Sequence, residues 1–121
     1  MPNGDYQDLI AWQKAFELAL AVYRETSKFP MEEKYGLTAQ LRRAGISIPS
    51  NIAEGQGRNS KGAFVHHLFI ALGSLKEAET QIMISNRLGY FKPNQTAKLL
   101  AMSAEVGRLI NGLSMTLRNR H

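Results

Sequence analysis

Residues 42–62 read RRAGISIPSNIAEGQGRNSKG, and this stretch decides the fold because it joins an amphipathic helix to a glycine-rich loop. With successive residues about 100° apart on a helix, one apolar face forms with a polar strip beside it. The spacing predicts a helix over 34–57. Its apolar face consists of Leu37, Leu41, Ala44, Ile48 and Ile52, and its polar strip of Arg43, Ser47, Ser50, Asn51, Glu54 and Arg58.

Pro49 lies inside this predicted helix. A proline there removes one backbone donor, and its ring presses on the carbonyl four residues back, which belongs to Gly45. Because a glycine gives the backbone local freedom, we expect a helix that is kinked but continuous. Gly55, Gly57 and Gly62 are expected to end the helix and supply a short loop.

The polar strip admits two interpretations. Small hydroxyl and amide side chains beside an apolar face let helices approach closely and bond across a partly buried contact, within one chain or between subunits. The alternative is a groove that contacts phosphate or a partner strand. Glu54 and Arg58 form an ordinary i, i+4 pair in either case. We favour packing or a subunit interface for the strip residues Ser47, Ser50, Asn51 and Glu54.

Before this stretch, the sequence predicts a first helix over 8–28, with Asp8 as its N-cap or first-turn acid. Phe29 and Pro30 end it, because proline cannot continue a helix. Trp12 is expected to anchor the core rather than to stack on a base. The apolar stripe at helical spacing is Leu9, Trp12, Phe16, Ala19 with Leu20, and Tyr23.

After the stretch, a third helix is predicted over 60–88, with Ser60 as its N-cap. Ile70 and Ile84 lie nearly opposite its main stripe, which indicates burial on two sides. In a chain of this size another subunit covers the second side most easily, so the pattern predicts an oligomer. The main stripe is Phe64, Leu68, Ala71, Leu72, Leu75, Ala78 and Ile82.

A fourth helix is predicted over 95–118, after a turn in which Gly89 takes the left-handed position and Pro93 blocks continuation. Asn94 or Thr96 is the expected cap. Gly107 and Gly112 weaken the helix, and we expect them to allow close helix contact. Its near-heptad stripe is typical of bundle packing and consists of Leu99, Met102, Val106, Leu109 with Ile110, Leu113 and Leu117.

Glu79 lies close to the middle of the third helix's apolar stripe. If it is buried, it needs a partner or must stay protonated, and the candidate partners are Arg42, Arg43 and Ser47. Alternatively the stripe is rotated and Glu79 reaches solvent. Glu77 is expected to be merely solvated.

Four amphipathic helices joined by short turns predict an all-α, antiparallel up-and-down four-helix bundle. At 121 residues the chain is expected to form a single domain over 1–121. It contains no cysteine, which excludes disulfides and thiolate metal sites. No run is long and apolar enough for a membrane span, and the N-terminus does not resemble a signal peptide. We therefore expect no membrane association and a cytoplasmic location.

The formal net charge is +5, and it is unevenly distributed. Residues 1–33 carry three basic and six acidic side chains, whereas residues 34–61 carry five basic and one acidic side chain, and residues 93–121 four and one. Segregated positive charge suits phosphate backbones or acidic protein surfaces. It also simply keeps a small protein soluble.

No catalytic constellation is present in the sequence. The segment GQGRNSKG lacks a preceding strand, HExxH is absent, and no helix carries the Glu-x-x-His pairs of a di-iron bundle. His66 and His67 are adjacent and so point in different directions on a helix. We expect no enzyme activity, no cofactor and no metal.

Four segments carry a resemblance to a known family: DLIAWQKA (8–15), QLRRAGISIPSNIAEGQGR (40–58), FIALGSLKEAETQI (69–82) and LGY (88–90). They resemble the four-helix-bundle proteins encoded by intervening sequences of bacterial 23S ribosomal RNA. The resemblance implies a ring-like homopentamer. The segment AEVGRLI (104–110) also resembles accessory variability proteins of diversity-generating retroelements, which are basic pentamers that bind nucleic acid and a reverse transcriptase.

Transferred to this sequence, the resemblance implies a nucleic-acid-facing surface made of Arg42, Arg43, Arg58, Lys61, Arg108, Arg118 and Arg120. The first functional hypothesis is a non-enzymatic homo-oligomer that binds structured RNA or another nucleic acid through these residues. The second is an assembly scaffold or accessory subunit that binds a protein partner, such as a reverse transcriptase, with no nucleic-acid role.

Overall fold

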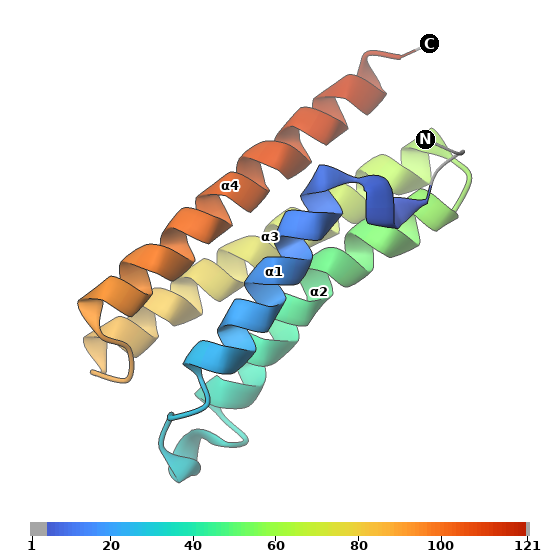
Figure 1. The fold of residues 1–121 in the computed structure, drawn as a ribbon. Coiled ribbons are helices and arrows are strands. Elements are labelled where there is room, and N and C mark those ends of the chain that lie inside the picture. The colour runs from blue at the N-terminus through green and yellow to red at the C-terminus, as the bar shows by residue number, and fades with distance from the viewer. Residues whose placement is uncertain (1–4, 121) are drawn as a thin grey trace.

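The computed structural model describes residues 5–120, in which four α-helices form the fold and no strand occurs. The helices are α1 (Ile10–Glu25), α2 (Leu37–Gly57), α3 (Lys61–Arg87) and α4 (Pro93–Arg118), with 3-10 turns η1 (Tyr6–Asp8) and η2 (Met31–Glu33). Figure 1 shows the four helices running alternately in opposite directions. Each helix packs against its neighbours in sequence, and α4 closes the arrangement against α1. The predicted all-α up-and-down bundle is confirmed.

The core is made of aliphatic residues from all four helices. For α2, α3 and α4 these residues lie on the faces that the sequence predicted. On α2, Leu41, Ala44, Ile48 and Ile52 are fully buried, and Leu37 is partly buried. The buried residues of α3 and α4 likewise come mainly from the predicted stripes and are Leu68, Ala71, Leu75, Ala78, Ile82, Leu99, Val106 and Ile110.

Only part of the apolar stripe predicted for α1 faces the core: Ala19 is buried, and Leu9 and Trp12 pack against the core as partly buried residues. Phe16, Leu20 and Tyr23 are each 41% exposed, and Trp12 is only partly buried. Trp12 packs against the core at its edge and also lies between the rings of Tyr6 and Phe16, at centroid distances of 5.2 and 4.9 Å. The core mainly uses a neighbouring face of α1, whose buried residues are Ala11, Ala15, Leu18, Ala21 and Val22, together with Ala19 of the predicted stripe.

The first two helices begin later than predicted because 3-10 turns precede them. Asp8 belongs to η1 and does not cap α1, and Asp5 caps η1 by accepting from the Gln7 N–H. α2 begins only at Leu37, whose N–H donates to the Glu33 carboxylate at 3.0 Å. The helix then continues through the buried Pro49, as predicted.

The loop between α2 and α3 uses an asparagine where glycines were predicted. Asn59 has φ 56°, a left-handed conformation that asparagine tolerates better than most residues. Gly55 is buried inside α2, where a Cβ would lie 2.6 Å from the His67 Cβ. Gly55 therefore brings α2 and α3 together, and only Gly57 ends the helix.

The later helix ends agree with the sequence in part. Ser60 caps α3 by accepting from the Ala63 N–H at 3.2 Å, and Gly89 has φ 80°, both as predicted. α4 begins at Pro93, and neither Asn94 nor Thr96 caps it. Instead Lys92 is the N-cap residue, because Pro93 occupies the first helical position. The Lys92 N–H donates to the Gln95 side chain at 2.8 Å.

The two glycines of α4 differ in their surroundings. A Cβ on Gly107 would lie 3.2 Å from the Leu75 side chain, whereas a Cβ on Gly112 would meet nothing within 4 Å. Close helix contact therefore explains Gly107 and does not explain Gly112. Along the described part of the chain, none of the helices is long and apolar enough to cross a membrane.

Candidate functional site

The structure divides the seven predicted basic residues between different parts of the bundle. Arg42 and Arg43 lie on the first turns of α2, near the loop that follows α1. At about 1.5 Å per residue, Arg58 lies about 24 Å further along α2. It lies at the bundle end where α2 stops, α3 begins and α4 finishes (Figure 1). The seven residues therefore do not form one patch.

Arg42 holds the end of α1 against α2. Its Nε donates to the buried Thr26 Oγ1 at 2.9 Å, and its Nη2 donates to the Tyr23 carbonyl at 3.2 Å. The guanidinium also lies 4.5 Å from the centroid of the Tyr23 ring. These contacts use two of the five N–H donors of the guanidinium and one of its faces, so Arg42 acts as a packing residue in this structure.

Arg43 is paired across the contact between α2 and α3. Its Nη2 lies 2.6 Å from the Glu77 carboxylate and also donates to Gln40. Glu77, predicted to be merely solvated, is thus an ion-pair partner. The pair leaves no net charge at this position for a phosphate to neutralise.

We use the name basic end for Arg58, Lys61, Arg118 and Arg120. Lys61 Nζ donates to the Arg120 carbonyl, which ties the start of α3 to the end of α4. Arg118 lies over the Phe69 ring, 5.8 Å from its centroid. Within residues 5–120, Lys61, Arg118 and Arg120 form no ion pair. Their positive charges are therefore not neutralised by these residues.

A groove of about 610 Å³ opens at the basic end. Lys61 and Arg120 line it together with polar side chains that can donate hydrogen bonds, namely Gln56, Asn59, Ser60 and Thr116. Its floor is apolar and is formed by Leu9, Phe64, Leu113 and Leu117. The groove thus combines cations and neutral donors with an apolar floor.

Arg108 lines an adjoining groove of about 360 Å³ between α1 and α4. The two grooves share Leu9, Leu113 and Thr116, so they form a continuous depression. Arg108 has no carboxylate within ion-pair distance among the described residues. The depression therefore extends the basic end toward the middle of the bundle.

Acidic residues also lie at this end and moderate its charge. Asp5 and Asp8 belong to the neighbouring turn η1. Glu54 pairs with Arg58 at 2.7 Å, and this hydrogen bond is the main cause that holds the pKa of Glu54 below its usual value of 4.5. His67, 3.8 Å from the same carboxylate, acts in the same direction. Arg58 is consequently less available to bind a phosphate than the other cations of the basic end.

The polar strip of α2 packs partly against α3 through a chain of hydrogen bonds. Ser47 bonds to Ser74 at 2.8 Å, Asn51 donates to Ser47 at 3.0 Å, and His67 Nδ1 bonds to the Asn51 Oδ1 at 3.0 Å. Ser74 was not singled out from the sequence, and His67 was considered only as a metal ligand, although both lie at helical spacing on the side of α3 that faces α2. The strip's small polar residues thus join two helices of one chain.

The remaining strip residue and Glu79 lie nearer the surface. Ser50 is exposed on the side of α2 that faces α1. Glu79 retains 20% side-chain exposure and pairs with Lys76 at 3.3 Å, so none of Arg42, Arg43 and Ser47 is its partner. Its stripe is rotated slightly, which is the second of the two alternatives that the sequence left open.

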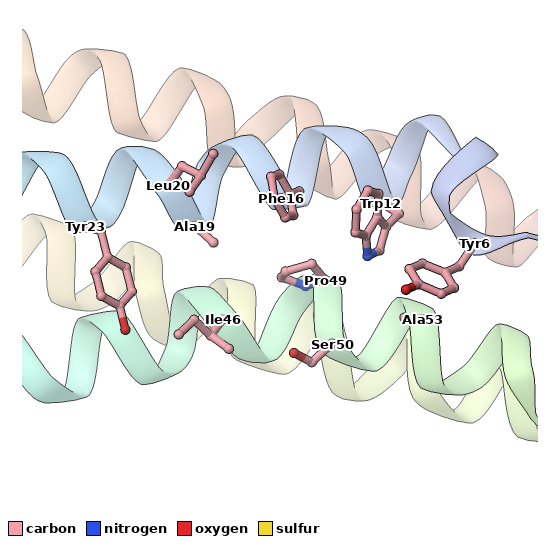
Figure 2. Close-up of a pocket in the computed structure, with 10 residues that line it drawn as sticks. All are labelled: Tyr6, Trp12, Phe16, Ala19, Leu20, Tyr23, Ile46, Pro49, Ser50 and Ala53. Carbon is pink, nitrogen blue, oxygen red and sulfur yellow. The ribbon is translucent and has the colours of Figure 1, made fainter.

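A second surface feature is the aromatic groove between α1 and α2, of about 480 Å³. Figure 2 shows side chains from both helices lining it, and none of them is charged. The misassigned stripe of α1 provides most of one wall. The groove residues are Tyr6, Trp12, Phe16, Ala19, Leu20, Tyr23, Ile46, Pro49, Ser50 and Ala53.

Among residues 5–120, no three histidine, aspartate or glutamate side chains come together in a group that could hold a metal ion. His66 and His67 contact each other edge to face at 5.7 Å. The acidic side chains near His67 are limited to Glu54, which Arg58 already binds. The described residues thus offer side-chain donors for phosphate and an apolar groove as their main surface features.

A family model described as 23S rRNA-intervening sequence protein matches residues 7–112. The chain belongs to this family. A solved structure from Bacteroides thetaiotaomicron, described as a protein with unknown function from the S23 ribosomal protein family, is 23% identical. The match covers 88% of this chain and 96% of that one, with a TM-score of 0.81. At this identity the likeness shows the fold alone. No curated protein gives a significant match to the sequence.

Proposed function

We propose that this member of the 23S rRNA-intervening sequence protein family is a non-enzymatic, cytoplasmic homo-oligomer that binds RNA through its basic end. The observation that carries the proposal is the set of three cations, Lys61, Arg118 and Arg120, which no carboxylate of residues 5–120 neutralises. They surround or adjoin a groove with neutral donors and an apolar floor.

This arrangement favours phosphate contacts over base recognition. Lys61 and Arg120 point charge at the groove, while Gln56, Asn59, Ser60 and Thr116 add hydrogen-bonding groups. Contacts of this kind release counterions from the nucleic acid, so affinity falls as salt rises, whereas base discrimination stays weak. The apolar floor leaves room for an unstacked base beside Phe64.

Self-association is the second part of the proposal, and the resemblance of the sequence implies five copies. It is supported by the apolar residues left half-exposed on one chain, among them Phe16, Leu20, Phe69 and Ile84. A ring of copies would also repeat the basic end around one face. Several weak phosphate sites acting together would bind a structured RNA more tightly than any single one.

The test is a double charge reversal, Arg118→Glu with Arg120→Glu, compared with the wild type in an RNA-retention assay at low salt. We expect retention to fall by about tenfold or more, because two phosphate contacts become repulsions. The matched control is Lys28→Glu with Lys92→Glu, which reverses two exposed cations at the opposite end of the bundle.

The two functional hypotheses give different outcomes. If the control variant loses as much RNA as the basic-end variant, binding depends only on net charge and the site is wrong. If neither variant nor the wild type retains RNA, the protein acts instead as a scaffold for a protein partner. A reverse transcriptase is the partner class that the sequence resemblance implies for that case.

A further inference from the structure

We propose that the aromatic groove of one copy receives the outer face of α3 from a second copy, in a head-to-tail contact. The outer face of α3 is defined here by Phe69, Ile70, Gly73, Met83 and Ile84. This inference rests on the self-association in the proposed function and assigns surfaces to it.

The groove leaves several large apolar side chains partly exposed, as is typical of a surface that binds a partner. On α1 the large side chains Phe16, Leu20 and Tyr23 point away from the core, while the alanines point toward it. Ile46 of α2 is similarly exposed across the groove (Figure 2). A helix whose larger apolar side chains face outward at regular spacing leaves apolar area that folding of a single chain does not bury.

The outer face of α3 is a second apolar surface, on the side of the bundle away from α1. Phe69, Ile70, Met83 and Ile84 are each between 40% and 49% exposed. Gly73 lies between the two pairs, and a Cβ there would meet nothing within 4 Å. Gly73 therefore presents exposed backbone on this face, to which a side chain of another copy has access.

The two surfaces lie at matching heights along the bundle. Gly45 of α2 contacts Ala19 and Val22 of α1, and Ser47 of α2 bonds to Ser74 of α3. These contacts place Phe16 and Leu20 within about one helical turn of the height of Gly73. If two copies lie side by side with no shift along the bundle axis, the groove of one therefore lies opposite Gly73 of the other.

A second pair of apolar residues supports the same placement. By the same contacts, Tyr35, which is 86% exposed, lies at about the height of Met83 and Ile84. A contact between copies with no shift along the bundle axis thus covers apolar side chains at two separate heights along the bundle. An isologous contact of groove with groove would leave the whole outer face of α3 uncovered.

The electrostatics of the two surfaces also favour a protein contact over a nucleic-acid one. None of the ten groove residues is charged, and Glu77 on the outer side of α3 is already paired with Arg43 of its own chain. Two cations adjoin the outer face of α3, since Arg118 lies over the Phe69 ring and Arg87 lies beside Met83 and Ile84, and both must stay at the rim of the contact. A polyanion would find no cation inside the groove to bind.

The first test uses complementary variants and light scattering. The groove variant is Phe16→Asp with Leu20→Asp, the face variant is Ile70→Asp with Ile84→Asp, and the control is Met115→Asp on the exposed side of α4. Each paired variant alone should fall to the 13.5 kDa mass of one chain, while the control keeps the wild-type mass. Mixing the two paired variants should restore dimers, because each retains one intact surface.

The second test is cross-linking, which remains informative if the aspartates disturb folding. The natural chain contains no cysteine, so introduced thiols are the sole sites of disulfide formation. Leu20→Cys mixed with Gly73→Cys should give a cross-linked dimer on mild oxidation. Neither variant alone should do so.

Three results would overturn the assignment, and they are distinguishable. Unchanged wild-type mass in both paired variants leaves the oligomer intact and places its interface elsewhere. Leu20→Cys cross-linking to itself indicates a two-fold contact. If the groove variant loses RNA retention while its oligomeric mass is unchanged, the groove binds nucleic acid. A wild type that stays monomeric at every concentration instead refutes the proposed self-association itself.

Discussion

Among single residues, Gly55 and Gly112 both lie in helices but have opposite surroundings, so their substitution by alanine should have opposite effects on stability. Gly55→Ala places a Cβ 2.6 Å from the His67 Cβ, where α2 packs against α3. Overpacking of this kind costs about 1–3 kcal/mol, which outweighs the gain of about 1 kcal/mol in helix propensity. Chemical denaturation should therefore show a less stable protein.

Gly112→Ala is the matched substitution on α4, where the added Cβ meets nothing within 4 Å. With no steric cost, the propensity term should raise the free energy of unfolding by about 1 kcal/mol. Opposite signs for the two variants would support the described packing. A stabilising Gly55→Ala would show that α2 and α3 are further apart than described.

Glu54 makes stability depend on pH in the acid range. Its folded-state pKa is lowered, chiefly by the Arg58 hydrogen bond, so the unfolded chain binds the proton more readily. The contribution is present above pH 4.5 and is lost as the pH falls below that value. Glu54→Gln should therefore be less stable than the wild type at neutral pH.

The measurement is thermal unfolding of both proteins across this pH range. The difference between their melting temperatures should shrink as the pH falls below 4.5. A difference that stays constant would mean that the Arg58 pair contributes nothing to folding. The exposed position of both side chains keeps the expected effect small.

Among the helices, the contact between α1 and α2 depends on Arg42, which the sequence had assigned to nucleic acid. Arg42→Lys keeps the charge and loses the fixed geometry that serves both Thr26 and Tyr23. We expect the free energy of unfolding to fall by about 1–3 kcal/mol, the range for hydrogen bonds from charged groups. RNA retention at a temperature where the variant is folded should not change.

Denaturation and RNA retention measured on the same preparation distinguish the two roles. Arg43→Lys serves as a comparison because its neighbour Glu77 accepts an ammonium as well as a guanidinium. Its stability should change by no more than about 0.5 kcal/mol. Reduced RNA retention with unchanged stability in Arg42→Lys would restore Arg42 to the binding surface.

The helices also show how far periodicity carries a prediction. Apolar spacing placed four helices and the buried faces of α2, α3 and α4, because each of these has one dominant aliphatic stripe. It misassigned the more exposed part of the α1 stripe, Phe16, Leu20 and Tyr23, because these side chains are larger than those of the alanine-rich face that the core mainly uses. Spacing reports where apolar residues lie on a helix, and a surface kept for a partner has the same period as a core face.

The candidate site was only partly visible in the sequence for a related reason. Arg118 and Arg120 were correctly expected to make the end of α4 basic, but which cations are already paired depends on neighbours distant in sequence. Thr26, which binds Arg42, lies 16 residues away in sequence, and Glu77, which binds Arg43, lies 34 residues away. The hydrogen-bonded chain through Ser74 and His67 required the packing of α2 on α3 to be known.

At the scale of the whole molecule, the bundle separates its surface functions by position. The basic end lies where the α2–α3 loop meets the end of α4, and the aromatic groove and the outer face of α3 lie along its sides. Under the proposed contact, copies joined through their sides would place every basic end on one rim. An RNA that spans several copies would then contact several sets of Lys61, Arg118 and Arg120.

The most direct measurement of this account is RNA binding at a series of salt concentrations, on protein whose oligomeric mass has been checked by light scattering. We predict tight binding at low salt that weakens linearly in log affinity against log salt. The slope should be shallower for Lys61→Gln with Arg120→Gln. No binding at low salt by a well-behaved oligomer, or binding that salt does not weaken, would contradict the account.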